Sequence, residues 1–358
     1  MSLSGLAFAL APVYSVAFGA RVGIGLGVSV VFIATLRFCA NWFRPNEFAT
    51  MSGSDRRRRR IGGVFATTPL ALAVESLGLR ATMIGLSVFG PAIAAAVALL
   101  ARDSSADAGL APIEDVPAGE SLSLDGVLAS AKRILEERET WLISAIMFCT
   151  LGINITVLGA WAVPYVAQVC NLSVTGASAF ALAGSLGLLV GPPSIGWLSD
   201  LTGRRTELII VGVFVFVCVY RILAVVRLPL LAVGIVFFVA SATGGASSLS
   251  YTVIKECHAA AASGVATGVV NSGAFLGAAV FPTVTGALLD SYWTGRDVAG
   301  ARVYSSAGFD AVFGLAAGAG VVALGCAAWL YRRERSEATA ERTTKAGLET
   351  DAETAPNG

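Results

Sequence analysis

Residues 196–205 read Gly196-Trp197-Leu198-Ser199-Asp200-Leu201-Thr202-Gly203-Arg204-Arg205, and this stretch decides the fold. It joins two long apolar segments, which indicates a short polar turn between two membrane helices. Gly196 allows a neighbouring helix to approach closely, and Asp200 can accept hydrogen bonds from a helix N-terminus or pair with an arginine. Gly203 permits a tight reversal. Arg204 and Arg205 are expected at the level of the lipid phosphates, and the simpler alternative is an ordinary basic loop beside a membrane.

The composition of the whole chain indicates a membrane protein. Its 358 residues are 55% hydrophobic and 14% charged, and the mean hydropathy is +0.74. A soluble, secreted, fibrous or disordered chain does not have this composition. The formal net charge is +1, so charge gives no indication of a nucleic-acid partner, and none is expected.

Long apolar segments recur along most of the chain. A spanning helix needs ~20 mostly apolar residues, and about ten segments approach or meet that length. We therefore predict an all-α polytopic membrane protein with about ten transmembrane helices. The segments are residues 3–19, 21–40, 61–78, 81–101, 141–166, 174–198, 207–226, 229–251, 264–289 and 307–331.

Residues 102–140 form a polar stretch in the middle of the chain. Its beginning has the Ser, Asp and Pro content of a linker. Its end predicts an amphipathic helix lying at the membrane surface, because apolar residues recur at helical spacing opposite charged ones. The apolar residues are Leu124, Val127, Leu128, Ala131, Ile134 and Leu135, and the charged ones are Lys132, Arg133, Glu136, Glu137 and Arg138.

The distribution of basic residues predicts the orientation of the chain. Lys and Arg gather in alternate connections, and basic loops mark the cytoplasmic side. This pattern places both termini and the middle loop in the cytoplasm of a multi-pass protein of the cell membrane. Residues 332–358 are then a cytoplasmic tail, which we expect to be disordered. The basic residues on that side are Arg44, Arg56 to Arg60, Lys132, Arg133, Arg138, Arg204, Arg205, Lys255, Arg332, Arg333 and Arg335.

The stretch at 196–205 resembles the loop motif of the major facilitator superfamily, which joins the second and third helices of each six-helix half. Residues 141–331 supply six helices with the motif at that place, as a C-terminal bundle does. Residues 1–101 supply only four. Arg21-Val22-Gly23-Ile24-Gly25-Leu26-Gly27 is similar to the family's R-x-x-x-G-x-G on the fourth helix. The resemblance therefore implies a two-bundle fold of four and six helices, with the first two helices of the family absent from this sequence.

A weak internal repeat and a run of arginines both concern the third segment. Residues 48–53 lead to Pro69 much as residues 259–264 lead to Pro282, which fits two related halves. Arg56 to Arg60 cannot enter hydrocarbon, at about 2.5–3.5 kcal/mol each. They are either a patch that binds anionic lipid or a locally altered or misread segment that shortens the helix.

Candidate transport residues are polar or ionisable residues in the spanning segments, because such residues are expensive there and often functional. Arg21 occupies the position that the resemblance implicates in coupling and in helix packing. Steps of seven, four and three place Asn154, Trp161, Tyr165 and Gln168 on one side of a helix. This face lines a central cavity in one interpretation and a helix–helix interface in the other. Tyr251 and Asn271 are further polar candidates.

The sequence offers no site for enzyme chemistry, a metal or a cofactor. It contains no Gly-Lys-Ser/Thr phosphate loop, its single histidine is His258, and its six cysteines are widely scattered. We expect a secondary active transporter that carries a small solute by alternating access. Arginines on the second segment favour an organic anion. The expected partners are that solute, a coupling ion (proton or sodium) and membrane lipids, and a monomer is expected. The alternative is a non-transporting membrane protein or an inactive relic of a transporter.

Overall fold

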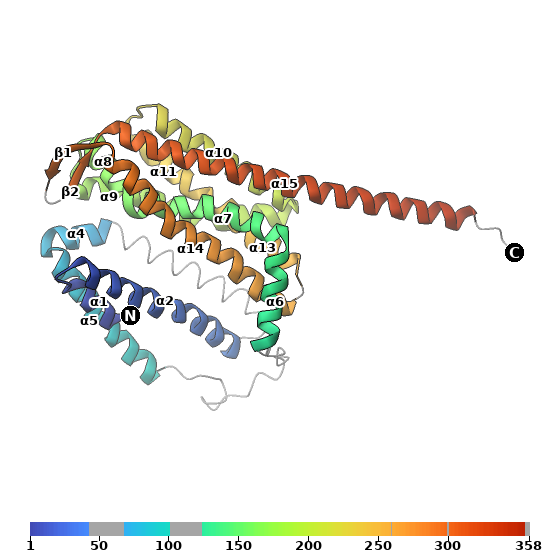
Figure 1. Cartoon of the computed structure of the whole chain (residues 1–358), viewed down its shortest axis with the longest axis horizontal. Helices are drawn as coiled ribbons and strands as arrows, with labels where there is room; N and C mark the ends of the chain where they lie inside the picture. The colour runs from blue at the N-terminus through green and yellow to red at the C-terminus, as the bar shows by residue number, and fades with distance from the viewer. Residues whose placement is uncertain (43–67, 101–123, 259, 299–300, 355–358) are drawn as a thin grey trace. The chain divides into compact units, whose positions relative to one another are not determined.

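The computed structural model describes residues 1–42, 68–100, 124–258, 260–298 and 301–354. The chain divides into two compact units, Met1–Ser121 and Leu122–Gly358. Each unit consists mainly of helices (Figure 1). Among the described residues, seven helices are long and apolar enough to cross a membrane, which confirms an all-α membrane fold but not the count of ten.

Unit 1 contains α1 (Ser2–Ala9), α2 (Tyr14–Trp42), α4 (Thr68–Leu77) and α5 (Leu79–Leu100). α1 packs against both α2 and α5. This part of the prediction needs correction, because α1 has only eight residues and α2 continues without a break through Arg21. The chain turns at Pro12 instead, since proline has no N–H to donate and disfavours helix at the residue before it.

Two sequence predictions for unit 1 fall largely outside the described residues. Of the third predicted segment, 61–78, the structure describes α4 alone. The Arg56 to Arg60 run lies outside the described residues, as do the first residues of the predicted linker. The fourth predicted segment, 81–101, agrees with the apolar span Leu79–Leu99 in α5.

Unit 2 contains six of the seven candidate spans, in the region where six were predicted. They are Arg138–Val169, Val174–Thr202, Arg205–Val225, Leu230–Lys255, Gly264–Asp290 and Ser306–Ser336. The amphipathic segment before them forms α6 (Leu124–Glu136), whose Ile134 is buried in the core of the unit. The predicted boundaries are therefore close to those of the helices throughout this half of the chain.

The first and fourth spans of unit 2 are interrupted helices, and the last is a single helix that is longer than a transmembrane segment. The first consists of α7 (Arg138–Thr156), a π-helical turn η2 (Val157–Trp161) and α8 (Ala162–Val169). The fourth consists of α11 (Leu230–Ala242), α12 (Gly244–Ser248) and α13 (Ser250–Glu256). The last, α15 (Ser306–Thr354), extends far beyond its apolar part, so the tail expected to be disordered is helical to Thr354.

The remaining helices of unit 2 are α9 (Val174–Thr202), α10 (Arg205–Val225) and α14 (Ala260–Asp290). A short antiparallel hairpin, β1 (Trp293–Val298) and β2 (Ala301–Tyr304), joins α14 to α15. The sequence analysis did not predict this hairpin. Aromatic and β-branched residues on both sides of Ala299-Gly300 were the available signal.

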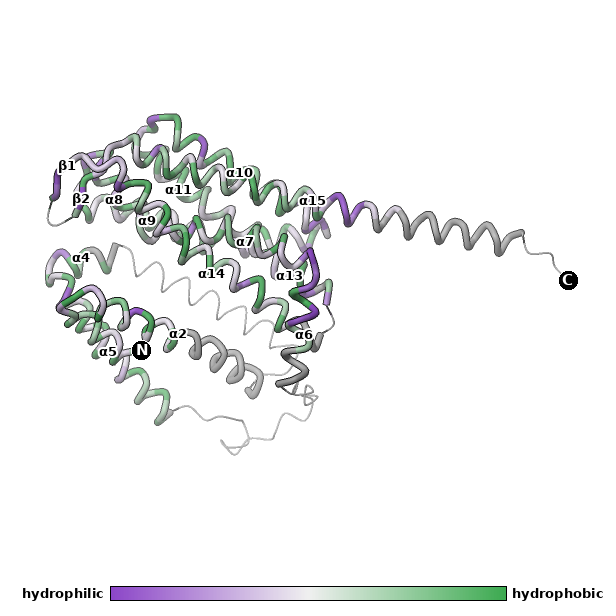
Figure 2. The backbone as a smooth tube through the Cα atoms, in the orientation of Figure 1, coloured by the Kyte–Doolittle hydropathy of each residue, from purple (hydrophilic) through white to green (hydrophobic). Residues whose placement is uncertain are grey.

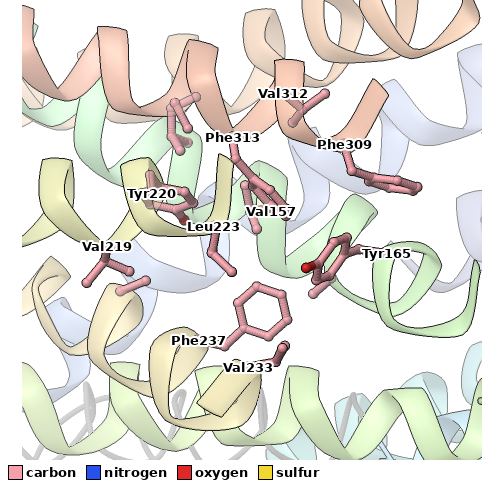
Figure 3. Close-up of a cluster of buried hydrophobic side chains, with 14 of the residues drawn as sticks. Val157, Tyr165, Val219, Tyr220, Leu223, Val233, Phe237, Phe309, Val312 and Phe313 are labelled. Carbon is pink, nitrogen blue, oxygen red and sulfur yellow. The ribbon is translucent and has the colours of Figure 1, made fainter. Parts of the chain in front are cut away.

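The interior of unit 2 consists of two apolar clusters. The first surrounds Tyr165, which makes edge-to-face contacts with Phe237, Phe309 and Phe313 (Figure 3). The second surrounds Met147 and includes residues of α6, α7, α10, α13, α14 and α15. Together they hold the six spans in one bundle.

Many exposed side chains of the helices are also apolar, and the hydropathy colouring shows hydrophobic residues along the described helices (Figure 2). Phe214 on α10, Phe275 on α14 and Val321 on α15 are each more than half exposed. A soluble protein rarely exposes so many large apolar side chains together. Such a surface fits the hydrocarbon of a bilayer.

Candidate functional site

The turn between α9 and α10 carries the sequence motif. α9 ends with Gly203 in the left-handed conformation at φ 67°, and the Gly203 N–H donates to the Ser199 carbonyl at 2.8 Å. α10 begins at Arg205. The reversal therefore takes a single left-handed residue, a conformation that glycine adopts without steric cost.

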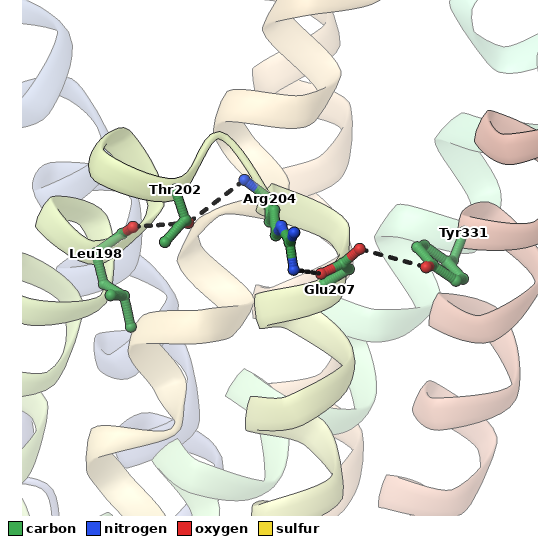
Figure 4. A network of polar contacts seen from close by, with 5 residues as sticks. All are labelled: Leu198, Thr202, Arg204, Glu207 and Tyr331. Carbon is green, nitrogen blue, oxygen red and sulfur yellow. Dashed lines mark hydrogen bonds and ion pairs between the residues drawn. The ribbon is translucent and has the colours of Figure 1, made fainter. Parts of the chain in front are cut away.

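Polar contacts fasten this turn to the neighbouring helix α15 (Figure 4). Arg204 Nη1 lies 3.4 Å from Glu207 Oε2, and the Tyr331 hydroxyl donates to Glu207 Oε1 at 3.3 Å. The residue before Glu207 makes a second contact, since the Thr206 hydroxyl donates at 2.7 Å to Oε1 of Glu334, which lies about one turn after Tyr331 on α15. α10 and α15 are thus joined at the motif end by two side-chain contacts.

A cleft of about 610 Å³ opens beside the turn. Its lining carries both charges, hydroxyl groups and one exposed thiol, so it offers polar contacts. The lining residues are Gly203, Arg204, Arg205, Thr206, Glu207, Val253, Cys257, Tyr331 and Glu334.

Two other motif residues do not make the contacts expected of them within the described residues. A Cβ atom at Gly196 would meet nothing within 4 Å, so no described helix packs closely there. Asp200 is exposed, and no hydrogen bond or ion pair joins it to another described residue. Both residues therefore remain available to contacts beyond those described.

Asn154 lies at the centre of unit 2, where α7 meets the interrupted helix α11–α12. Its Nδ2 donates to the Ala240 carbonyl at 3.2 Å, and the side chain is 1% exposed. Its Oδ1 is buried and has no hydrogen-bond partner among the described residues. A buried amide oxygen without a donor is costly, so this atom is suited to accept a hydrogen bond from water or from a bound molecule.

The helix opposite Asn154 is broken at Thr243 and Leu249. The Ala246 N–H donates to the Thr243 carbonyl at 2.9 Å, and the Leu249 N–H donates to the Ala246 carbonyl at 3.0 Å, in the tighter i to i+3 pattern. The Gly244-Gly245 pair permits these breaks. A Cβ atom at Gly245 would lie 2.6 Å from the Gly191 backbone, so α9 and α12 touch through their main chains.

The other residues of the predicted polar face turn to different neighbours. Trp161 Nε1 donates to the Thr285 hydroxyl of α14 at 2.7 Å, whereas Tyr165 is 2% exposed within the aromatic cluster. Gln168 contacts the hairpin through its amide group. The π-helical turn η2 explains the divergence, because its wider turn breaks the 3.6-residue period between Asn154 and Trp161.

The remaining candidates divide between the two units. Tyr251 and Asn271 are brought together, since the Tyr251 hydroxyl donates to Asn271 Oδ1 at 2.6 Å. Arg21 is exposed on α2 in unit 1. Thr150 was not among the predicted candidates, and it lies buried in the same bundle, where the Ser247 hydroxyl donates to its Oγ1 at 2.7 Å. Small hydroxyl residues are too common in membrane helices to stand out in a sequence.

Comparisons with known proteins agree with this architecture. The structure is similar to the crystal structure of a bacterial homolog of the human lysosomal transporter Spinster, in an inward-facing and unoccupied conformation. The TM-score is 0.66 and the identity is 16%, over 91% of this chain and 79% of that one. At this identity the likeness shows the fold alone. No curated protein matches the chain in sequence.

The family profile of the Major Facilitator Superfamily matches residues 145–355, which is more than half of the chain. The matched region covers nearly all of the six spans of unit 2 and the motif turn. Members of this family are membrane transporters. The chain belongs to the Major Facilitator Superfamily of membrane transporters.

Proposed function

We propose that the protein is a secondary active transporter that carries a small organic anion by alternating access. In this mechanism two helical bundles rock around a site near the middle of the membrane. Membership of the family is the single observation that carries the proposal. The polar centre of unit 2 supports it, since the buried Asn154 Oδ1 has no hydrogen-bond partner in the part of the chain that the structure describes and lies beside a broken helix.

Charge supports an anion as the solute. The second helix, Tyr14–Trp42, contains Arg21 and Arg37 and no acidic residue. An arginine inside a membrane helix is expensive and pairs readily with a carboxylate or a phosphate. Uptake of an anion against the membrane potential needs a driving force, for which we propose a proton or sodium gradient.

The proposal also includes the location, orientation and partners of the protein. The protein is a monomer of the cell membrane with both termini in the cytoplasm, in contact with membrane lipids and with no nucleic-acid partner. The basic residues of the motif turn and of the beginning of the tail, Arg204, Arg205, Arg332, Arg333 and Arg335, support this orientation by the positive-inside rule.

Uptake into proteoliposomes tests the proposed function. The purified full chain is reconstituted, and entry of radiolabelled monocarboxylates, dicarboxylates and organic phosphates is compared with entry of neutral sugars and organic cations of similar size. We expect saturable uptake of at least one anion and none of the cations. If a folded protein moves no solute faster than protein-free vesicles do, the chain is a non-transporting membrane protein instead.

A further inference from the structure

The hairpin between α14 and α15 lies at the end of unit 2 opposite the motif turn. It follows α14 directly, and it contacts Gln168, which lies just before the beginning of α9, whereas the motif lies at the end of α9. Its strands pair with Trp293 opposite Tyr304 and with Val298 opposite Ala301. All described residues of β1 are exposed, whereas the second half of β2 is partly buried and its Tyr304 packs against the first apolar cluster.

Gln168 contacts the hairpin as a neighbouring strand would. Its Nε2 donates to the Arg302 carbonyl at 3.1 Å, and its Oε1 accepts from the Tyr304 N–H at 2.9 Å. In a strand, the carbonyl of one residue and the N–H of the second residue after it point to the same side. The side-chain amide of Gln168 therefore satisfies both backbone groups on one edge of β2.

Further contacts fasten the hairpin to α14. Arg302 Nη1 lies 2.8 Å from Asp290 Oδ1, and the Tyr304 hydroxyl donates to the same oxygen at 3.1 Å. The hydrogen bond to Asp290 raises the pKa of the Arg302 guanidinium above its ordinary value. Partial burial, with the Asp290 hydrogen bond adding to it, raises the pKa of the Tyr304 hydroxyl. Both shifts favour the protonated forms that make these contacts with Asp290.

The helix that carries Gln168 follows an irregular turn of its span. α8 follows the π-helical turn η2, and Pro164 removes one backbone donor within it. π-helical turns and prolines are the usual places where a helix bends. α8 is held by Ala162, Tyr165 and Val166, which are buried in the first apolar cluster. Beside this core, Trp161 just before α8 bonds to α14 and Gln168 near its end bonds to β2.

We infer that Gln168 is a positioning residue that latches α8 to the hairpin, so that α8, β2 and the end of α14 move as one piece when the span bends at η2. The latch itself is a property of unit 2. Its effect on transport rests on the proposed function, because only a transporter that rocks between two states needs this end of the bundle to move and close. The latch then governs the rate of the conformational change and not the affinity for the solute.

Hydrogen–deuterium exchange of the full-length protein in lipid nanodiscs tests the latch without a substrate. Gln168→Met keeps the size of the side chain and removes both hydrogen bonds. We expect exchange in residues 301–305 and 162–170 to become about tenfold faster, as the loss of two net hydrogen bonds implies. Thr294→Val is the matched control, because it removes the hydrogen bond from the Thr294 hydroxyl to the Val303 carbonyl within the same hairpin and touches nothing on α8.

The outcomes separate the latch from the proposed function. Unchanged exchange at residues 162–170 in Gln168→Met, or an equal increase in Thr294→Val, overturns the latch. In a transport assay, Gln168→Met should change Vmax severalfold and leave KM nearly unchanged, and a changed KM at constant Vmax also overturns it. Absence of any uptake by the unmodified protein counts against the proposed function alone, and the exchange experiment then decides the latch by itself.

Discussion

Asn154 is the residue on which the proposed transport most depends within unit 2. We predict that Asn154→Leu lowers solute uptake at least about tenfold while the protein stays folded. Leucine fits the apolar interior and leaves no unpaired amide, and a membrane hydrogen bond such as the one to Ala240 stabilises by only about 0.6 kcal/mol on average. Uptake and thermal stability measured on the same preparation check this. Normal uptake by a stable Asn154→Leu protein would show that the amide serves packing alone.

Asp200 gives a second prediction at the same scale. Asp200→Asn should slow uptake severalfold without lowering thermal stability, because the carboxylate is exposed and bonds to no other described residue. Asp200 then acts in another conformation of the protein, or through a contact outside the described residues. Glu207→Gln is the matched comparison, since Glu207 contacts both Arg204 and Tyr331 within unit 2, and it should affect thermal stability as well. Uptake by Asp200→Asn at the normal rate would make the motif a structural turn only.

Single residues were predictable from the sequence where local chemistry decides their role. Gly203 was expected to reverse the chain, and its φ of 67° has that effect. Tyr165 was placed on a polar face, and the structure buries it among phenylalanines instead. Periodicity could not reveal this, because it assumes a regular helix and η2 lies between Asn154 and Tyr165.

At the scale of helices, the close packing of α7 against α14 leaves different amounts of space at two glycines of α14. A Cβ atom at Gly277 would clash with the Phe148 carbonyl and lie 3.1 Å from Gly152, whereas one at Gly268 would meet nothing within 4 Å. Gly277→Ala should therefore destabilise the protein by about 1–3 kcal/mol through overpacking. Gly268→Ala should be neutral or stabilise by up to about 1 kcal/mol through helix propensity. Thermal unfolding of both variants checks the pair, and equal stability would contradict the described packing.

Helices were predictable where hydropathy alone determines them. All six spans of unit 2 were placed within a few residues of their boundaries, because each is a long apolar run bounded by polar or charged residues. The first segment was misplaced, since the break at Pro12 lies within an apolar run that hydropathy reads as continuous. The interruption of α11–α13 and the β1–β2 hairpin depend on backbone hydrogen bonds that hydropathy does not report.

For the whole molecule, the orientation in the membrane can be tested at the two ends of α9. This helix has 29 residues and spans about 44 Å at 1.5 Å per residue, more than the ~30 Å of hydrocarbon. Asn171 before it and Thr202 at its end are both exposed. In a background without native cysteines, a membrane-impermeant maleimide should label Asn171→Cys in intact cells and Thr202→Cys only after permeabilisation. The reverse pattern would invert the proposed topology.

The family and the two-bundle class were predictable from the sequence because a ten-residue motif lies at a specific place among the helices. The solute was not predictable from the sequence. Specificity for a solute depends on a few polar groups, and only the fold determines which residues lie next to them. Tyr251 and Asn271, for example, lie 20 residues apart in sequence and are joined by one hydrogen bond in the structure.

Counterflow in proteoliposomes tests alternating access most directly. Vesicles containing the full-length protein are loaded with a high concentration of an unlabelled transported anion and diluted into a trace of the labelled form. A carrier that alternates between two states releases unlabelled anion outside and then binds labelled anion for its return to the inside. The label inside the vesicles should therefore rise transiently above its equilibrium level and then fall. A steady approach to equilibrium without this overshoot, in vesicles that take up the same anion, would contradict a carrier and indicate a pore.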